Sequence, residues 1–446
     1  MTTQTDGGTC EMTAGCEVVA VCVPDNVGRL VGKRVSIEKW GSVAKHGLAM
    51  PNFHLVTGVE NVPATDLDVT GTHTGFPNGR LVPTRETLCR PPWEPATAFV
   101  ICDVERIDGS RVEEAPRTIL AQQVQRLKDL GLEARCASEL EFYVFARPLD
   151  ELAASGFARL PPSWHRHGDN DVLVSGFDED FIGAVRHSMS AIGIDIEVAQ
   201  GEGGPGQHEL NLSPHGPLRA ADQHVLYKHG VKALAHQVGL SVTFMAKPSV
   251  EWAGSSGHVH ISLQDGNGSA ALGGDDLSEL GRSFLAGMLA FSPELALMHA
   301  PYANSYRRLR PGSFAPANTT WGWDNRSCMV RVVTQSPGIR FEFRVPGADT
   351  NPYHAYSALI AAGLAGVERN LVPPLPIQGD AYADPGAKHL PRDLTEAIQM
   401  FESSEVAQEA FGPTIHRHLS MLGQRELDAS RRAVTDWDRQ RCFEPA

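Results

Sequence analysis

Four separated segments of the chain alternate apolar and polar residues at the spacing of a β-strand: residues 139–142, 209–212, 258–262 and 340–344. Successive side chains of a strand point to opposite faces, so each segment has one apolar face and one polar face. Solvated strand faces usually carry Lys, Thr, Ser and Gln. Here the polar positions are dominated by carboxylates, imidazoles and guanidinium groups, which indicates a binding or catalytic surface.

The pattern around these segments predicts an α+β fold. The first hundred residues favour strands, at 17–23, 55–58 and 98–104, with Gly- and Pro-rich turns between them. From Pro116 the apolar residues recur at helical spacing up to a stop at Gly131, and a strand at 138–145 follows. Further helices are expected at about 181–192, 219–238, 277–290, 352–368 and 394–410. The change in character predicts two domains, residues 1–110 and 111–446.

Composition narrows the class of protein. The chain has 446 residues, 42% of them hydrophobic and 21% charged, as expected of a globular enzyme. The formal net charge of −14 argues against nucleic acid or an anionic membrane as partner. No signal peptide and no apolar run of about eighteen residues is visible, so we expect a cytoplasmic protein.

Cysteine usage agrees with a reducing compartment. The eight cysteines are scattered, form no C-x-x-C pair and often lie in apolar runs: Cys10, Cys16, Cys22, Cys89, Cys102, Cys136, Cys328 and Cys442. We therefore predict buried free thiols rather than a disulfide framework or a zinc site.

The acidic residues of the polar faces form a candidate metal site. The set comprises five carboxylates and one imidazole: Glu139, Glu141, Glu202, Glu209, His258 and Glu342. A single buried Glu is commonly salt-bridged and a single strand His is commonly structural, but so many like charges share one site only if cations neutralise them. Oxygen-rich ligation favours Mg²⁺ or Mn²⁺ over zinc or copper, and six ligands suit two ions that bridge nucleotide phosphates.

Arginines supply the complementary charge. Five of them fall between residues 308 and 344: Arg308, Arg326, Arg331, Arg340 and Arg344. Arginine binds carboxylates and phosphates through two parallel hydrogen bonds, so this stretch predicts an anionic ligand. The Gly-rich segment at 201–209 lacks the spacing of a phosphate-binding loop. The segment at 254–258 would let the backbone approach a ligand closely or would be a flexible turn, and a turn is the interpretation favoured for each segment alone.

Taken together, these segments resemble the glutamine synthetase family over nearly the whole chain. Its E-x-E strand appears as Glu139-Leu-Glu141, and its acidic pair around a Pro-Gly-Gln turn appears as Glu202-Gly-Gly-Pro-Gly-Gln-His-Glu209. Its G-S-x-x-H-x-H-x-S-L segment appears as Gly254-Ser-Ser-Gly-His258-Val-His260-Ile-Ser262-Leu. Its later motifs match Asn304–Gly312, Asn325-Arg326-Ser, Arg331, Arg340-Phe-Glu342-Phe-Arg344 and Asn351-Pro352-Tyr353.

The resemblance implies a small N-terminal β-grasp domain beside a large catalytic domain whose antiparallel sheet lines the active site. It implies ATP as co-substrate and L-glutamate as substrate, with active sites between the subunits of a ring, usually a double hexamer. One ion would be held by Glu141, Glu202 and Glu209, and the other by Glu139, His258 and Glu342. The family pattern assigns glutamate to Arg308, Arg344 and the backbone of Gly254, and ATP to His260, Ser262, Arg331 and Arg340. It also makes Arg326 and Arg308 catalytic residues, and Arg326 would stabilise charge on the transferring phosphoryl group.

Departures from the family pattern concern the nitrogen acceptor. Ammonia-using members carry a Glu in the loop after the glutamate-binding arginine, where this chain has Phe314. Their D-G-S-S motif, which helps to hold ammonium, has no match here, and Ala253 stands where they have Asn. Phenylalanine offers apolar surface but accepts no proton.

These departures predict a ligase of the γ-glutamylamide-forming branch, which joins glutamate to an organic amine. The alternatives are an ammonia-assimilating glutamine synthetase and a non-catalytic structural or regulatory relative. Phe314, together with Trp321 and Trp323, favours apolar surroundings and hence a small monoamine as acceptor. The residues leave open which amine is used and which group would take its proton.

Overall fold

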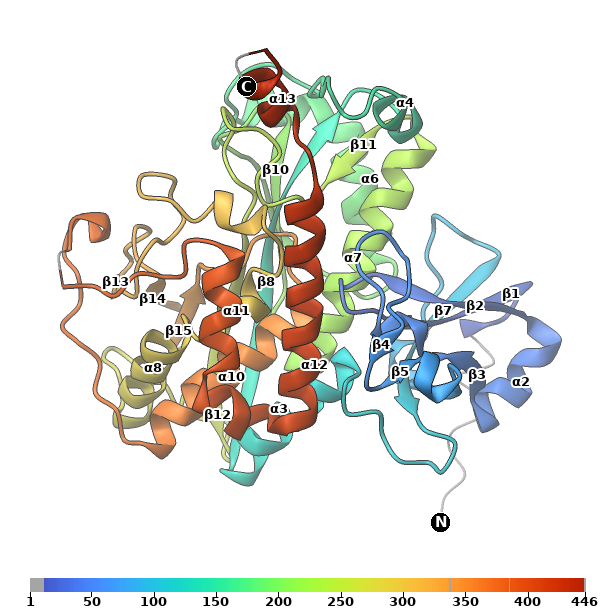
Figure 1. Cartoon of the computed structure of the whole chain (residues 1–446), viewed down its shortest axis with the longest axis horizontal. Helices are drawn as coiled ribbons and strands as arrows, with labels where there is room; N and C mark the ends of the chain where they lie inside the picture. The colour runs from blue at the N-terminus through green and yellow to red at the C-terminus, as the bar shows by residue number, and fades with distance from the viewer. Residues whose placement is uncertain (1–11, 337, 385, 445–446) are drawn as a thin grey trace.

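Two large β-sheets, a further two-stranded sheet and the helices packed on them make up the computed structural model, which describes residues 12–336, 338–384 and 386–444 (Figure 1). The strands are β1 (Val18–Pro24), β2 (Leu30–Ser36), β3 (Leu48–Pro51), β4 (Asp66–Leu67), β5 (Thr70–Gly71), β6 (Asn78–Pro83), β7 (Thr97–Glu105), β8 (Leu132–Phe145), β9 (Ile196–Gly201), β10 (Gln207–Leu212), β11 (Ser241–Thr243), β12 (Gly257–Asp265), β13 (Trp321–Trp323), β14 (Val330–Ser336) and β15 (Gly338–Phe343). The helices are α2 (Ile37–His46), α3 (Pro116–Asp129), α4 (Leu149–Ala154), α5 (Val172–Ser175), α6 (Glu179–Ser190), α7 (Pro217–Gln237), α8 (Glu279–Phe291), α9 (Ala296–His299), α10 (Pro352–Glu368), α11 (Leu394–Glu402), α12 (Glu405–Arg432) and α13 (Asp436–Cys442).

The N-terminal sheet, blue in Figure 1, has the strand order β2-β1-β7-β6-β3. Its two central strands, β1 and β7, are parallel, and the outer strands add antiparallel to them. Helix α2 packs Trp40 and Val43 into the same core as Val19 and Val21. A helix against a mixed sheet that contains one parallel pair is the β-grasp arrangement that the resemblance implied.

The second sheet carries the polar faces. Its order is β13-β14-β15-β12-β8-β10-β9, and every pair is antiparallel except β13 and β14. The apolar positions of its strands, including Leu140, Phe142, Leu210 and Phe341, lie in one buried cluster with residues of α7, α8 and α10. The alternation read from the sequence therefore buries one face and leaves the other for the site.

A buried polar cluster joins the two parts of the molecule. Arg117 on α3 donates through Nε and Nη2 to the two carboxylate oxygens of Asp222 on α7, both at 3.1 Å, and also pairs with Asp103 on β7. Tyr353 on α10 donates to Asp222 at 2.6 Å. At the start of α10, Asn351 donates to the carbonyl oxygens of Asp25 and Asn26 at 3.1 and 3.0 Å. These contacts fix the N-terminal sheet against the helices that support the site.

Two predicted elements are wrong. The apolar run at 55–58 forms no strand: Asn52–Leu55 is a 3-10 turn, and Leu55 and Val56 are buried within a loop. Short apolar runs do not reveal their conformation by periodicity alone. The helix expected at 394–410 is two helices, because Ser404 caps α12 by accepting a hydrogen bond from Ala407 N at 3.0 Å.

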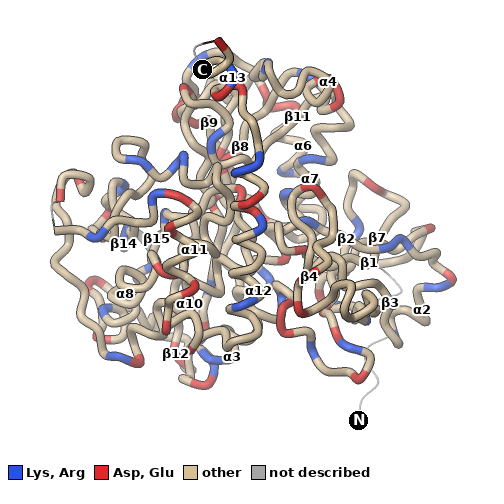
Figure 2. Tube along the Cα trace, viewed as in Figure 1, with Lys and Arg blue, Asp and Glu red and all other residues tan. Residues whose placement is uncertain are grey.

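The described cysteines follow the prediction of buried free thiols with one exception. Six free cysteines are buried, whereas Cys442 is exposed, and Cys10 lies outside the described residues. Acidic and basic positions intermingle over the coloured trace in Figure 2. Among the described residues, no helix is both long and apolar enough to span a membrane.

Candidate active site

A cavity of about 1120 Å³ opens on the polar face of the larger sheet. Every candidate site residue from the sequence lines it: Glu139, Glu141, Glu202, Glu209, Gly254, His258, His260, Ser262, Arg308, Phe314, Arg326, Arg331, Arg340, Glu342 and Arg344. Strand pairing accounts for much of this convergence. Glu209 on β10 lies opposite Glu141 on β8, and His258 on β12 lies opposite Glu139.

Three carboxylates at one end of the cavity, those of Glu141, Glu202 and Glu209, offer oxygens within 4.8 Å of one another. Burial, with the charge of Glu141, raises the pKa of Glu202 to about 7. Burial and the charges of Glu139 and Glu141 raise the pKa of Glu209 well above its ordinary value. Burial also raises the pKa of Glu141. Burial and mutual repulsion thus disfavour the ionised forms of these carboxylates, and a divalent cation fits that set of oxygens.

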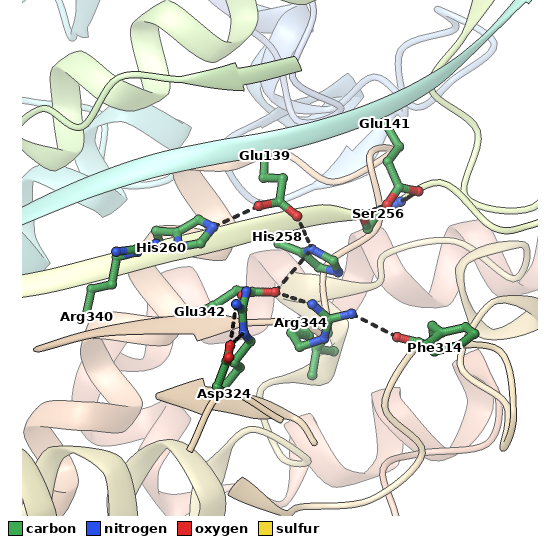
Figure 3. A network of polar contacts seen from close by, with 12 residues as sticks. Glu139, Glu141, Ser256, His258, His260, Phe314, Asp324, Arg340, Glu342 and Arg344 are labelled. Carbon is green, nitrogen blue, oxygen red and sulfur yellow. Dashed lines mark hydrogen bonds and ion pairs between the residues drawn. The ribbon is translucent and has the colours of Figure 1, made fainter. Parts of the chain in front are cut away.

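Glu139, His258 and Glu342 form a second group whose ligand atoms lie within 4.8 Å of one another (Figure 3). His258 Nδ1 lies 2.8 Å from Glu139 Oε1. Burial and the Arg344 charge lower the pKa of His258 to about 4, so its imidazole is neutral at physiological pH. Burial alone would raise the pKa of Glu139, but the hydrogen bonds from His258 and His260 hold it well below its usual range. A neutral imidazole between two ionised carboxylates also fits a divalent cation.

Two residues that donate hydrogen bonds to Glu141 were not among the site residues predicted from the sequence. Ser256 N donates to Glu141 Oε2 at 2.8 Å, and the Ser256 hydroxyl donates to Oε1. Gln207 Nε2 donates to Glu141 Oε2 at 3.1 Å and to the Gly254 carbonyl at 3.0 Å. Gln207 belongs to the Pro-Gly-Gln turn noted in the sequence. Its position between Glu202 and Glu209 is the sequence feature that could have identified it as a site residue.

Arginines engage the second group directly. Arg331 Nη1 donates to Glu342 Oε2 at 2.6 Å, and Arg344 Nη1 donates to Glu342 Oε1. Burial alone would raise the pKa of Glu342, but the charge of Arg344 outweighs it and lowers that pKa to about 2. Arg331 also donates from Nε to Asp324 Oδ1 at 2.7 Å. Side chains that the family pattern assigns to three different ligands are therefore joined in one network (Figure 3).

Arg308 is a buried cation at the cavity wall, only 4% exposed. Its guanidinium donates to the carbonyl oxygens of Val345 and Arg344 at 3.0 and 3.2 Å. Burial lowers its pKa to about 10, so it remains charged at neutral pH. Within the described ranges it forms no ion pair, which leaves its charge for an anionic ligand.

Gly254 lies against this arginine. A Cβ added to Gly254 would sit 2.7 Å from Arg308 Cγ and 3.0 Å from the Ala246 carbonyl oxygen. Only glycine allows the backbone to approach Arg308 so closely. Ala253, which precedes Gly254, is a neighbour of Gly203: a Cβ added to Gly203 would lie 3.9 Å from the Cβ of Ala253.

Phe314 presents an apolar surface at the same end of the cavity. Its side chain is 74% exposed, and its backbone has a φ of 55°, which is unusual for a residue with a side chain of this size. Its carbonyl oxygen accepts a hydrogen bond from Arg344 Nη2 at 3.1 Å.

The apolar surroundings expected from two tryptophans are not found. Trp321 is 3% exposed and donates from Nε1 to the Pro374 carbonyl at 2.8 Å, so it belongs to the core. Trp323 lies beside a separate hollow with Asn325 and Pro376. Of the described aromatic residues singled out in the sequence, Phe314 alone lines the cavity.

The remaining predicted residues lie elsewhere along the cavity wall. Arg340 Nε donates to His260 Nδ1 at 3.4 Å, and His260 Nε2 lies 3.0 Å from Glu139 Oε2. Ser262 follows His260 on β12 and is partly buried. Arg326 is exposed and borders both the cavity and the neighbouring hollow.

Comparison with known proteins agrees with this site. Residues 113–442 match the family described as glutamine synthetase, catalytic domain. The chain is 39% identical to a γ-glutamylethanolamide synthetase of Streptomyces coelicolor, over 96% of this chain and 93% of that protein. It is 35% identical to a glutamate–isopropylamine ligase of a Pseudomonas species, over 93% and 92%.

Solved structures show the same fold. The structure titled "GmaS/ADP complex-Conformation 1" superposes with a TM-score of 0.86 at 25% identity, covering 99% of this chain and all of that one. On the sequence match, the shared fold and the two groups of ligating side chains, this chain belongs to the glutamine synthetase family.

Proposed function

We propose that this protein is an ATP-dependent ligase that joins the γ-carboxylate of L-glutamate to an organic amine. ATP would phosphorylate the γ-carboxylate, the amine would displace phosphate from the γ-glutamyl phosphate, and a γ-glutamylamide, ADP and phosphate would be released. One observation carries the proposal: an exposed phenylalanine, Phe314, lines the same cavity as two intact sets of metal-ligating side chains. The phosphorylating half of the site is retained, and the acceptor half offers apolar surface.

The named relatives support the same class of enzyme. The proteins named above as a γ-glutamylethanolamide synthetase and a glutamate–isopropylamine ligase are aligned over more than nine-tenths of this chain. Burial of a small alkyl group against Phe314 would contribute about 1–2 kcal/mol to binding.

The cations would be Mg²⁺ or Mn²⁺, one held by Glu141, Glu202 and Glu209 and one by Glu139, His258 and Glu342. Bound there, they would neutralise the phosphates of ATP and the charge that develops during phosphoryl transfer. Oxygen ligands with a single imidazole favour these two ions.

The chain's own side chains would orient the substrates. Arg308, buried and without an ion pair among the described residues, would bind a carboxylate of glutamate together with Arg344 and the backbone of Gly254. His260, Ser262, Arg331 and Arg340 would face ATP. Arg326, exposed at the edge of the cavity, would stabilise the transferring phosphoryl group. We further propose a ring-shaped homo-oligomer, a dodecamer, with sites shared between subunits.

The test is ATP-dependent phosphate release with glutamate, Mg²⁺ or Mn²⁺ and a panel of acceptors, with mass detection of the product. The panel comprises ammonium, methylamine, isopropylamine, ethanolamine, aniline and putrescine. Turnover with an amine and little with ammonium is expected. Ammonium as the best acceptor would identify an ammonia-assimilating glutamine synthetase, and no turnover with any acceptor would identify a non-catalytic relative.

A further inference from the structure

Besides the five carboxylates of the two candidate metal groups, two more line the cavity: Asp169 and Glu197. Neither belongs to the motifs described above, and neither was among the predicted site residues. They differ in which end of the cavity they face. Their positions decide which of them could bind a cationic amine in a site that has Phe314 in place of a carboxylate.

Asp169 lies beside the Glu202 end. Its loop is bound to the strand end by Gly168 N donating to the Glu202 carbonyl at 3.3 Å and Asn170 N donating to the Gly201 carbonyl at 3.1 Å. The side chain of Asp169 is exposed, and its Oδ1 accepts a hydrogen bond from Asn170 Nδ2 at 2.7 Å. Within the described part of the chain, Oδ2 has no protein donor and is available to a ligand.

The same end of the cavity leads on to the proposed glutamate site. Gly203 follows Glu202 and faces Ala253, and Gly254 packs on Arg308. Arg308 donates to the Arg344 carbonyl, and Arg344 donates to the Phe314 carbonyl. Asp169 is therefore connected through these neighbouring residues to Arg308 and Phe314, all of which line the cavity. His260 and Arg340 are assigned to the proposed ATP side.

Glu197 faces the opposite end. It lies on β9 opposite the irregularity between Asn211 and Leu212. Burial and the Arg135 charge lower the pKa of His215, and the Glu197 charge raises it. Glu197 is exposed and lines the cavity, as Asp169 does, so it provides a matched control.

Resting on the proposed function, we propose that Asp169 is the residue that receives the amine acceptor in its cationic form, so that the acceptor is an aliphatic amine and not an arylamine. An alkylamine is protonated at neutral pH, as a lysine side chain is, and an arylamine is not. Phe314 cannot attract a cation by charge, but Oδ2 of Asp169 can accept a hydrogen bond from an ammonium group while the alkyl part contacts Phe314. Burial, the Glu141 charge and also the Asp169 charge raise the pKa of Glu202, which agrees with Asp169 adding negative potential at this end.

The test compares the full-length wild-type enzyme with Asp169→Asn and Glu197→Gln, each supplied with ATP, glutamate and Mg²⁺. The acceptors are ethanolamine and isopropylamine, which are cationic at neutral pH, and hydroxylamine and aniline, which are neutral. The γ-glutamyl products are quantified by mass. We expect Asp169→Asn to lower kcat/KM for the cationic amines about tenfold or more, mainly through KM, and to leave hydroxylamine turnover nearly unchanged. Glu197→Gln should leave all acceptors unchanged, and Asp169→Glu should restore part of the activity with cationic amines.

Equal losses of Asp169→Asn with cationic and neutral acceptors would show a structural role and overturn the inference. So would unchanged kinetics with the cationic amines, or a wild-type preference for aniline. Wild-type enzyme that makes no amide from any amine would overturn the proposed function, and this inference with it. Wild-type activity with amines that does not depend on Asp169 would overturn the inference alone.

Discussion

Arg344 donates from Nη2 to the backbone carbonyl oxygen of Phe314 at 3.1 Å, and its other terminal nitrogen pairs with Glu342. The residue that departs from the family pattern is thus attached to an arginine proposed to bind glutamate. Arg344 holds the loop through the backbone of Phe314, so the side chain of Phe314 can be replaced without breaking this hydrogen bond.

Phe314→Glu should shift the acceptor preference from alkylamines towards ammonium. The substitution removes the apolar surface that the alkyl group would contact, so kcat/KM for isopropylamine should fall about five- to thirtyfold. Turnover with ammonium should rise. The ratio of the two kcat/KM values is the measurement, with KM for ATP as the control that should not move.

A Phe314→Leu variant separates apolar surface from charge. It should keep the preference for alkylamines over ammonium, at reduced rate. If Phe314→Glu neither gains activity with ammonium nor loses activity with isopropylamine, the role given to this side chain is wrong.

Glu209→Gln should change metal binding and metal-free stability in opposite directions. Glu209 is 6% exposed and lies among Glu139, Glu141 and Glu202, whose charges raise its pKa together with burial. Removing one charge relieves repulsion, so the melting temperature in a chelator should rise. The increase in melting temperature on adding Mg²⁺ or Mn²⁺ should shrink, because one oxygen ligand has lost its charge. Glu279→Gln, at the first turn of α8 and outside the cavity, should leave the metal response unchanged.

The strand alternation made most of the site predictable. Side chains on one face of neighbouring antiparallel strands are near each other, so the spacing of Glu139, Glu141, His258 and Glu342 sufficed to expect one cluster. The same alternation runs through Leu132, Ala134 and Cys136, which are buried, and it extends β8 six residues before the expected start.

Residues brought in by loops were not predictable in this way. Asp169 approaches Glu202 through two backbone hydrogen bonds of a loop, and no period in the sequence encodes that approach. The network of Glu342 with Arg331 and Arg344 is likewise a matter of side-chain conformation. The division of the chain near residue 110 and the roles of the individual site residues remain predictions.

Gly254→Ala should weaken glutamate binding more than ATP binding. The new Cβ would lie 2.7 Å from Arg308 Cγ and 3.0 Å from a backbone oxygen, so Arg308 must move. Displacement of a substrate-orienting group by a fraction of its contact distance costs on the order of ten- to hundredfold in kcat/KM for glutamate. Initial-rate kinetics in both substrates measure this. The control is Gly41→Ala on α2, where a new Cβ would meet no atom of the described chain within 4 Å. Equal changes in KM for ATP and for glutamate would contradict the assignment of Arg308.

His299→Leu should make the protein less sensitive to acid. His299 on α9 is fully buried, and its ring packs on Phe343 with centroids 4.8 Å apart. Neither ring nitrogen has a hydrogen-bond partner among the residues that the structure describes. Burial lowers its pKa to about 3 from the ordinary value of 6.5. Between these two values the unfolded chain binds a proton that the folded chain does not, so stability falls as the pH drops below about 6.5. This one imidazole should cost the wild-type protein about 2 kcal/mol of unfolding free energy between pH 7 and pH 5.

Denaturant unfolding of wild type, His299→Leu and a control at both pH values measures the effect. The control is His165→Gln, because His165 is exposed in a loop. His299→Leu should lose about 2 kcal/mol less than wild type on acidification, and His165→Gln should follow wild type. Other buried histidines, such as His354 and His418, whose pKa values burial lowers to about 3 and about 4, keep part of the acid sensitivity in every variant. The difference between variants therefore isolates His299, and an identical loss in all three proteins would show that this imidazole does not remain neutral in the folded state.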